Sequence, residues 1–117
     1  MANIKFSGNI GKEPELRYTP EGKPVLGFSV ALYTGGTKEK GFSDPVWVRV
    51  SAFDDLAEKT SEFLTSGARV TVTGIPRPPR TWTDKSGAVH PVGLEITARE
   101  IELGDGFKTA TVEDVPY

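Results

Sequence analysis

Residues 46–53 read VWVRVSAF, and the two faces of this segment differ in character. In a β-strand successive side chains point to opposite sides, so every second residue shares a face. One face carries only apolar side chains, those of Val46, Val48, Val50 and Ala52. The other face carries Trp47, Arg49, Ser51 and Phe53. Because the valine face already provides a core, the pattern predicts a half-buried strand whose outer face suits a flat, anionic ligand.

Alternating apolar residues also mark the segments on either side. They predict strands at residues 4–11, 24–33, 69–75 and 92–99. We expect the first two of these strands to be antiparallel neighbours. The inward residues are expected to be Ile4, Phe6, Gly8 and Ile10 in the first strand and Val92, Leu94, Ile96 and Ala98 in the last. Residues 34–45 hold three glycines and little that could pack, which indicates a mobile loop.

A short helix is expected over residues 54–64, with Asp54 as its N-cap and Gly67 just past its end. The prolines in residues 76–80 should lift the chain off the sheet, and residues 84–87 (DKSG) indicate a hairpin turn. Five strands with one short helix between the third and fourth match the all-β, five-stranded Greek-key barrel called the OB-fold, which binds oligonucleotides and oligosaccharides on its open face.

The length, charge and cysteine content of the chain indicate its domain organisation. The chain has 117 residues, no cysteine and a net charge of −2, which predicts one small domain without disulfides. Residues 1–100 hold 13 basic and 12 acidic side chains, whereas residues 101–117 hold Lys108 and four acids. We therefore expect a binding domain over residues 1–103 and a short acidic tail over residues 104–117. No segment resembles a membrane span or a secretory signal, so we place the protein in the cytoplasm.

Signals for catalysis are weak. His90 is the single histidine, no cysteine is present as a nucleophile, and Asp54 with Asp55 is better explained as a helix start than as an acid/base pair. No phosphate-binding glycine loop and no carboxylate cluster for a metal is evident. We predict that the protein is not an enzyme and needs neither cofactor nor metal.

A stronger signal is the interleaving of aromatic and basic residues. The aromatic set is Trp47, Phe53 and Trp82, and the basic set is Arg49, Arg77, Arg80 and Lys85. Aromatic rings stack on bases of any sequence, and cations follow the phosphate backbone. The alternative is that both tryptophans are barrel core. The valine face opposite Trp47 and the polar neighbours of Trp82 favour the surface.

With these residues identified, the chain resembles bacterial and phage single-stranded DNA-binding proteins, the SSB family. The resemblance covers about residues 4–103. It rests on GNIGKEPELRYTPEG at residues 8–22, on residues 46–53 with Leu56-Ala57-Glu58, and on Gly74 followed by Arg77, by RTWTD at residues 80–84 and by Ser86-Gly87. In that family the aromatics at the positions of Trp47, Phe53 and Trp82 stack on bases. The expected function is sequence-independent binding of single-stranded DNA, with Arg17, Arg49, Arg77, Arg80 and Lys85 on phosphates.

The resemblance also implies partners. Family members are mostly homotetramers, and their acidic C-terminal tip, ending in Pro-Phe, recruits replication, recombination and repair enzymes. The corresponding residues here are Glu113, Asp114, Val115, Pro116 and Tyr117. Tyr117 replaces the phenylalanine. Residues 104–112 would form a tether reaching only about 15 to 18 Å.

Departures from the family pattern bear on affinity. Residues 35–37 (Gly-Gly-Thr) stand where relatives often have a further Trp, and Asp55, Thr65 and Ser66 stand where they often have Lys or Arg. Three competing functions remain open: an OB-fold accessory subunit of a replication-restart complex that acts mainly through partners, an oligosaccharide or peptide binder, and a small-barrel nuclease.

Overall fold

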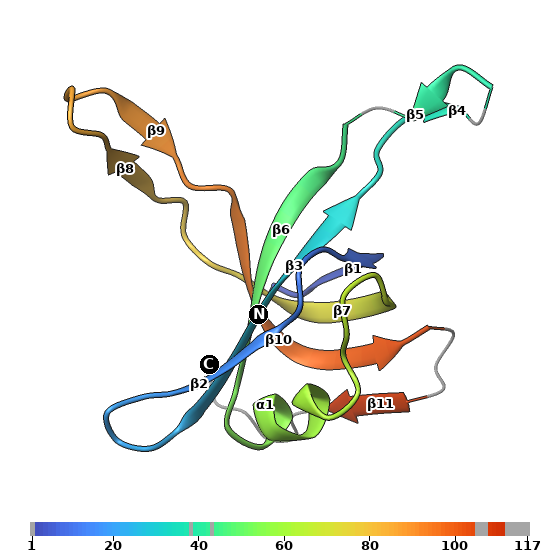
Figure 1. Ribbon diagram of the computed structural model, residues 1–117, viewed down its shortest axis with the longest axis vertical. Coiled ribbons are helices and arrows are strands. Elements are labelled where there is room, and N and C mark those ends of the chain that lie inside the picture. Colours follow the sequence, from blue (N-terminus) through green and yellow to red (C-terminus); the bar gives the residue numbers. More distant parts are fainter. Residues whose placement is uncertain (1, 38, 43, 105–107, 112–117) are drawn as a thin grey trace.

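The computed structural model describes residues 2–37, 39–42, 44–104 and 108–111 (Figure 1). Its main strands are β1 (Ile4–Ile10), β3 (Pro24–Leu32), β6 (Val46–Phe53), β7 (Arg69–Pro76) and β10 (Leu94–Leu103). The shorter elements are β2 (Glu15–Tyr18), β4 (Gly36–Thr37), β5 (Gly41–Phe42), α1 (Asp54–Ser61), β8 (Thr81–Thr83), β9 (Val89–Pro91) and β11 (Lys108–Thr111). Within these residues no helix is long and apolar enough to cross a membrane.

The main strands close into a barrel. Their order is β1-β7-β10-β6-β3, and β3 pairs back with β1. The β10–β6 pair is parallel and the other pairs are antiparallel. This order confirms the predicted OB-fold. The expected pairing of the first two strands holds only at the end of β1, where Asn9 and Ile10 oppose Ala31 and Val30, because the rest of β1 pairs with β7.

The core fills the barrel with the inward residues of the alternating pattern. Its members are Ile10, Leu26, Phe28, Val30, Val48, Val50, Ala52, Leu56, Ala57, Leu64, Val70, Val72, Ile96, Ala98 and Ile101. Gly8 is needed where β1 crosses β3, because a Cβ there would collide with the backbone carbonyl of Ala31. Ile4 was expected to face inward but is 39% exposed, since it lies at the open end of its strand.

Helix α1 is shorter than predicted and begins differently. Its N-cap is Phe53, which makes no side-chain capping bond, so the prediction of Asp54 as N-cap is wrong. Asp54 instead takes the turn from β6 into the helix at φ +54°, a left-handed conformation that Asp tolerates better than most residues. The helix ends at Ser61. Its buried side, Leu56, Ala57 and Thr60, packs against the core.

Two hairpins extend beyond the barrel (Figure 1). The expected loop over residues 34–45 contains the paired strands β4 and β5, so part of it is ordered by backbone hydrogen bonds. After Pro76 the chain leaves the sheet, as the prolines predicted, and β8 pairs with β9 in a separate two-stranded sheet. We call residues 77–93 the β8–β9 arm. The predicted turn at residues 84–87 is confirmed, with Gly87 at φ +90°.

The last barrel strand starts later and runs further than predicted. Leu94, expected to face inward, is 56% exposed, because β7 ends at Pro76 opposite Ile96 and no residue of β7 pairs with Leu94. After Leu103 the chain returns as β11, which pairs with β10. Residues 108–111 therefore form a strand, although the sequence assigned them to a tether. The tip at residues 113–117 lies outside the described residues.

Candidate nucleic-acid interface

The groove on the barrel surface arises from the register of β3 and β6. Opposite residues of an antiparallel pair project from the same face of the sheet. Ala31 opposes Trp47, Ser29 opposes Arg49, Gly27 opposes Ser51 and Val25 opposes Phe53. The small side chains of β3 thus lie beside the large side chains of β6. We call the surface formed by these eight residues the outer face.

Trp47 lies at one end of the outer face. Its side chain is half exposed, so the prediction that it belongs to the surface and not to the core is confirmed. A Cβ added at Gly11 would lie 2.8 Å from Cζ3 of the indole, too close for any real contact. The glycine therefore lets the ring lie against the backbone that leaves β1. An indole held in this way keeps a broad apolar surface open to a ligand.

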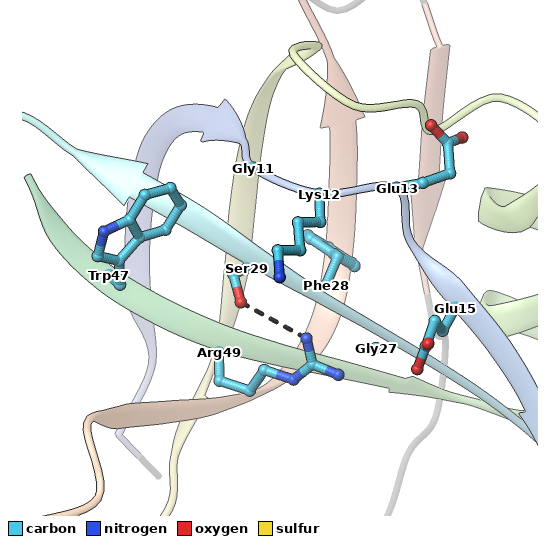
Figure 2. Close-up of a pocket in the computed structure, with 9 residues that line it drawn as sticks. All are labelled: Gly11, Lys12, Glu13, Glu15, Gly27, Phe28, Ser29, Trp47 and Arg49. Atoms are coloured by element: carbon cyan, nitrogen blue, oxygen red, sulfur yellow. Dashed lines mark hydrogen bonds between the residues drawn. The ribbon is translucent and has the colours of Figure 1, made fainter.

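Arg49 lies over the centre of the outer face. Its Nη2 atom would be 2.5 Å from a Cβ at Gly27, and its Nη1 donates a 3.5 Å hydrogen bond to Ser29 Oγ. The guanidinium occupies the space that the missing side chain leaves, and its other N–H groups are available to a ligand. Figure 2 shows Lys12 in the same pocket, with its side chain extending from the segment after Gly11 toward Ser29 and Arg49.

These residues line a groove of about 620 Å³. It continues into a shallower hollow of about 260 Å³, which shares Gly27 and Arg49 with it and is bordered by Arg17 and Tyr18. Phe53 lies six residues along β6 from Trp47, about 20 Å away at the rise of a strand, and is 39% exposed. The result is a continuous, shallow channel with an aromatic side chain near each end of β6.

Sequence reasoning missed two residues of this channel. Lys12 and Tyr18, the latter 60% exposed, were quoted only as part of residues 8–22, without a role in binding. Their proximity to Arg49 depends on how β2 pairs with β3, which residue identity does not reveal.

Acidic groups also border the channel: Glu13 accepts a hydrogen bond from the Ser66 N–H, and Glu15 lies 3.4 Å from Arg17. The pairing with Glu15 offsets part of the Arg17 charge.

The β8–β9 arm carries the other aromatic residue. Trp82 is 53% exposed, which confirms that it is not core, and its ring stacks on His90 with centroids 4.5 Å apart. Lys85 is exposed in the turn at the tip of the arm. Figure 1 shows the arm projecting away from the barrel. The structure therefore aligns Trp47, Arg49 and Phe53 along one face of β6 and places Trp82 and Lys85 on a separate element.

Arg80 is engaged at the base of the arm. Its Nε and Nη2 donate 2.8 Å hydrogen bonds to the two carboxylate oxygens of Glu95 on β10. These bonds raise the pKa of Arg80 and lower that of Glu95. The backbone reinforces the contact, because the Arg77 N–H bonds to the Glu95 carbonyl and the Val92 N–H to the Arg80 carbonyl. Arg80 thus connects the arm to the barrel, a role that its sequence context did not indicate.

The fold and this surface define an OB-fold protein with a binding channel lined by aromatic and basic side chains. Across the described ranges, no group of three or more His, Asp or Glu side chains could hold a metal ion. The sequence model of the "Single-strand binding protein family" matches residues 1–103. The chain belongs to this family, a family of DNA-binding proteins and not of enzymes, as the sequence predicted.

A named relative agrees with the family assignment, and a solved structure agrees with the fold. The chain is 38% identical over 110 residues to single-stranded DNA-binding protein 1 of Xylella fastidiosa (strain 9a5c), covering 88% of this chain and 76% of the relative. The crystal structure of a small single-stranded DNA-binding protein from Streptomyces coelicolor is similar, with a TM-score of 0.73 and 24% identity over 89% of this chain and 94% of that one. The structural likeness supports the OB-fold.

Proposed function

We propose that the protein binds single-stranded DNA without reading its sequence. The observation that carries the proposal is the outer face, where Trp47 and Phe53 are exposed along one strand with Arg49 between them. Membership of the single-strand binding protein family points the same way. Bases stack on Trp47, Phe53 and the arm residue Trp82, each contributing about 1–3 kcal/mol. In duplex DNA the base faces are already stacked on one another, so this surface favours single strands.

The cations hold the phosphates between the stacked bases. Arg49 and Lys12 lie in the groove itself, and Arg17, Arg77 and Lys85 extend the path along the hollow and the arm. Arg80 contributes less because Glu95 already neutralises it. Each neutralised phosphate changes the slope of log K against log salt by about −0.7 on single strands, so a few contacts give a modest salt dependence.

The protein acts as a homo-oligomer, a tetramer by resemblance to the family. Exposed apolar side chains at the barrel strand ends, Ile4, Val46 and Leu94, offer surface that another copy would cover. The C-terminal tip, residues 113–117, recruits replication, recombination and repair proteins. This last step rests on the sequence alone. The place of action is the cytoplasm, where the DNA and those enzymes are.

Intrinsic tryptophan fluorescence tests the proposal directly, because both tryptophans of the chain are assigned to the DNA path. The protein is titrated with oligo-dT and with duplex DNA of equal length, at low and at high salt. We expect deep quenching by oligo-dT that persists through moderate salt and is absent with duplex. Weak, strongly salt-sensitive binding, or equal quenching by oligo-dT and duplex DNA, would instead favour the alternative of an accessory subunit that acts mainly through protein partners.

A further inference from the structure

Trp82 does not stand free on the arm, since a histidine covers one side of its ring. Trp82 on β8 and His90 on β9 are a cross-strand pair. Their ring centroids are 4.5 Å apart and the ring planes are inclined by 22°. The indole is nevertheless 53% exposed. One face of the Trp82 indole therefore lies against the imidazole, and the opposite face is open.

His90 is itself held by the turn at the tip of the arm. His90 Nε2 donates a 2.7 Å hydrogen bond to Asp84 Oδ2. The other carboxylate oxygen accepts bonds from the N–H groups of Ser86 and Ala88 and from the Ser86 hydroxyl. The Ser86 hydroxyl first, and then His90, lower the pKa of Asp84 to about 2. An ionised carboxylate only accepts hydrogen bonds, so Nε2 of His90 is the donor of this bond.

The arm needs such support. An isolated two-stranded hairpin is marginally stable in water, and β8 and β9 form a sheet of their own. The turn backbone holds Asp84, Asp84 holds His90, and His90 stacks on the indole, so all of these contacts lie within the arm. A ring fixed before DNA arrives loses less conformational entropy when it binds.

From this geometry we infer that His90 is the positioning residue for Trp82: its imidazole backs the indole and leaves one face, hence one base, to be bound there. The inference rests on the proposed function, single-stranded DNA binding. The ring of His90 is what matters for the stack, and the bond to Asp84 sets its orientation.

The stack is tested first without DNA. A Trp47→Phe background leaves Trp82 as the single tryptophan, and acrylamide quenching of its fluorescence measures how much of the indole is open. We expect His90→Ala to increase the quenching and Val89→Ala to leave it unchanged. Val89 is the matched control, because it is 65% exposed on the same strand next to His90. Unchanged quenching in His90→Ala would overturn the inference.

The role in binding is tested by replacing the ring and the hydrogen bond separately. His90→Phe keeps a ring and loses the bond to Asp84, whereas His90→Gln keeps a donor and loses the ring. We expect His90→Ala and His90→Gln to weaken oligo-dT binding about two- to tenfold, the range of an aromatic pair, and His90→Phe to retain most of the affinity. In a Trp82→Ala background, His90→Ala should cause no further loss.

Other results would count against the positioning role. An equal loss in the Trp82→Ala background would mean that His90 contacts DNA itself. Full affinity in His90→Gln would mean that the hydrogen bond, and not the ring, is what matters. If the unsubstituted protein does not bind oligo-dT, the proposed function fails and the positioning role with it, while the acrylamide result still reports whether the stack exists.

Discussion

The indole of Trp47 lies against Gly11, with no room for a methyl group between them. The two residues belong to different parts of the chain, and their contact fixes the position of the indole in the groove. A side chain at residue 11 would have to move the ring, because the contacting atoms, Cζ3 and Cη2, are part of a rigid indole.

Gly11→Ala should therefore weaken DNA binding without unfolding the barrel. We expect a loss of about 1 kcal/mol in binding free energy, the lower end of the range for one stacked base. Gly93→Ala is the matched control, because its Cβ would lie 3.7 Å from the Trp47 carbonyl oxygen, an ordinary contact. Fluorescence titration with oligo-dT measures both variants. Equal affinities would show that the ring position at Gly11 is unimportant.

Removing an exposed aromatic ring should weaken DNA binding and leave stability nearly unchanged. Removing a buried ring should instead lower the free energy of unfolding. Trp47→Ala should cost about 1–3 kcal/mol in oligo-dT binding, with little change in the free energy of unfolding, since the ring is half exposed. Phe28→Ala, in which a fully buried core ring is lost, should lower the free energy of unfolding by about 3–5 kcal/mol. Urea denaturation measures the second quantity. A large loss of stability in Trp47→Ala would place its ring in the core after all.

The sequence predicted the elements whose pattern is local. Strand alternation placed Trp47 and Arg49 on the face opposite Val48 and Val50, because the period of a strand fixes the side without knowledge of its partners. Features that depend on which strands pair, and in which register, could not be predicted from the sequence. The groove exists because Gly27 and Ser29 happen to oppose Ser51 and Arg49, and register cannot be read from composition.

Long-range contacts explain the remaining differences. The sequence predicts that Arg80 contacts phosphate, but it does not reveal the pairing with Glu95, which lies fifteen residues further along the chain on another strand. Leu94 fits an alternating apolar pattern, yet β7 ends before reaching it. In both cases the local sequence pattern is real, but the surroundings of the residue depend on a strand that is distant in the sequence.

The Arg80–Glu95 pair provides a test of which cations reach the DNA. Glu95→Gln removes the negative charge and leaves Arg80 free to bind a phosphate. We expect tighter binding of oligo-dT at low salt and a salt slope more negative by about 0.7, one additional phosphate. Glu102→Gln, on the same strand, removes an equal charge away from the arm and is the control. An identical gain in both variants would reflect net charge alone.

The pKa of Asp84 predicts how stability depends on pH. The carboxyl group has a pKa of about 2 in the folded protein against an ordinary value of 3.8, mainly because of its bond from the Ser86 hydroxyl. A lowered folded pKa means that the unfolded chain binds the proton more readily. The stabilisation is therefore complete above about pH 5, well above the pKa of the unfolded chain, and is lost as the pH falls through about 2.

Asp84→Asn removes this contribution. Melting temperatures of the two proteins, measured between pH 2 and pH 6, should differ by a constant amount above about pH 5, with the unsubstituted protein higher, and the difference should shrink below pH 4. Glu95, whose pKa Arg80 also lowers, is present in both proteins, so its titration largely cancels in the comparison. A difference that stays the same down to pH 2 would mean that the hydrogen bonds of the turn do not depend on the charge of Asp84.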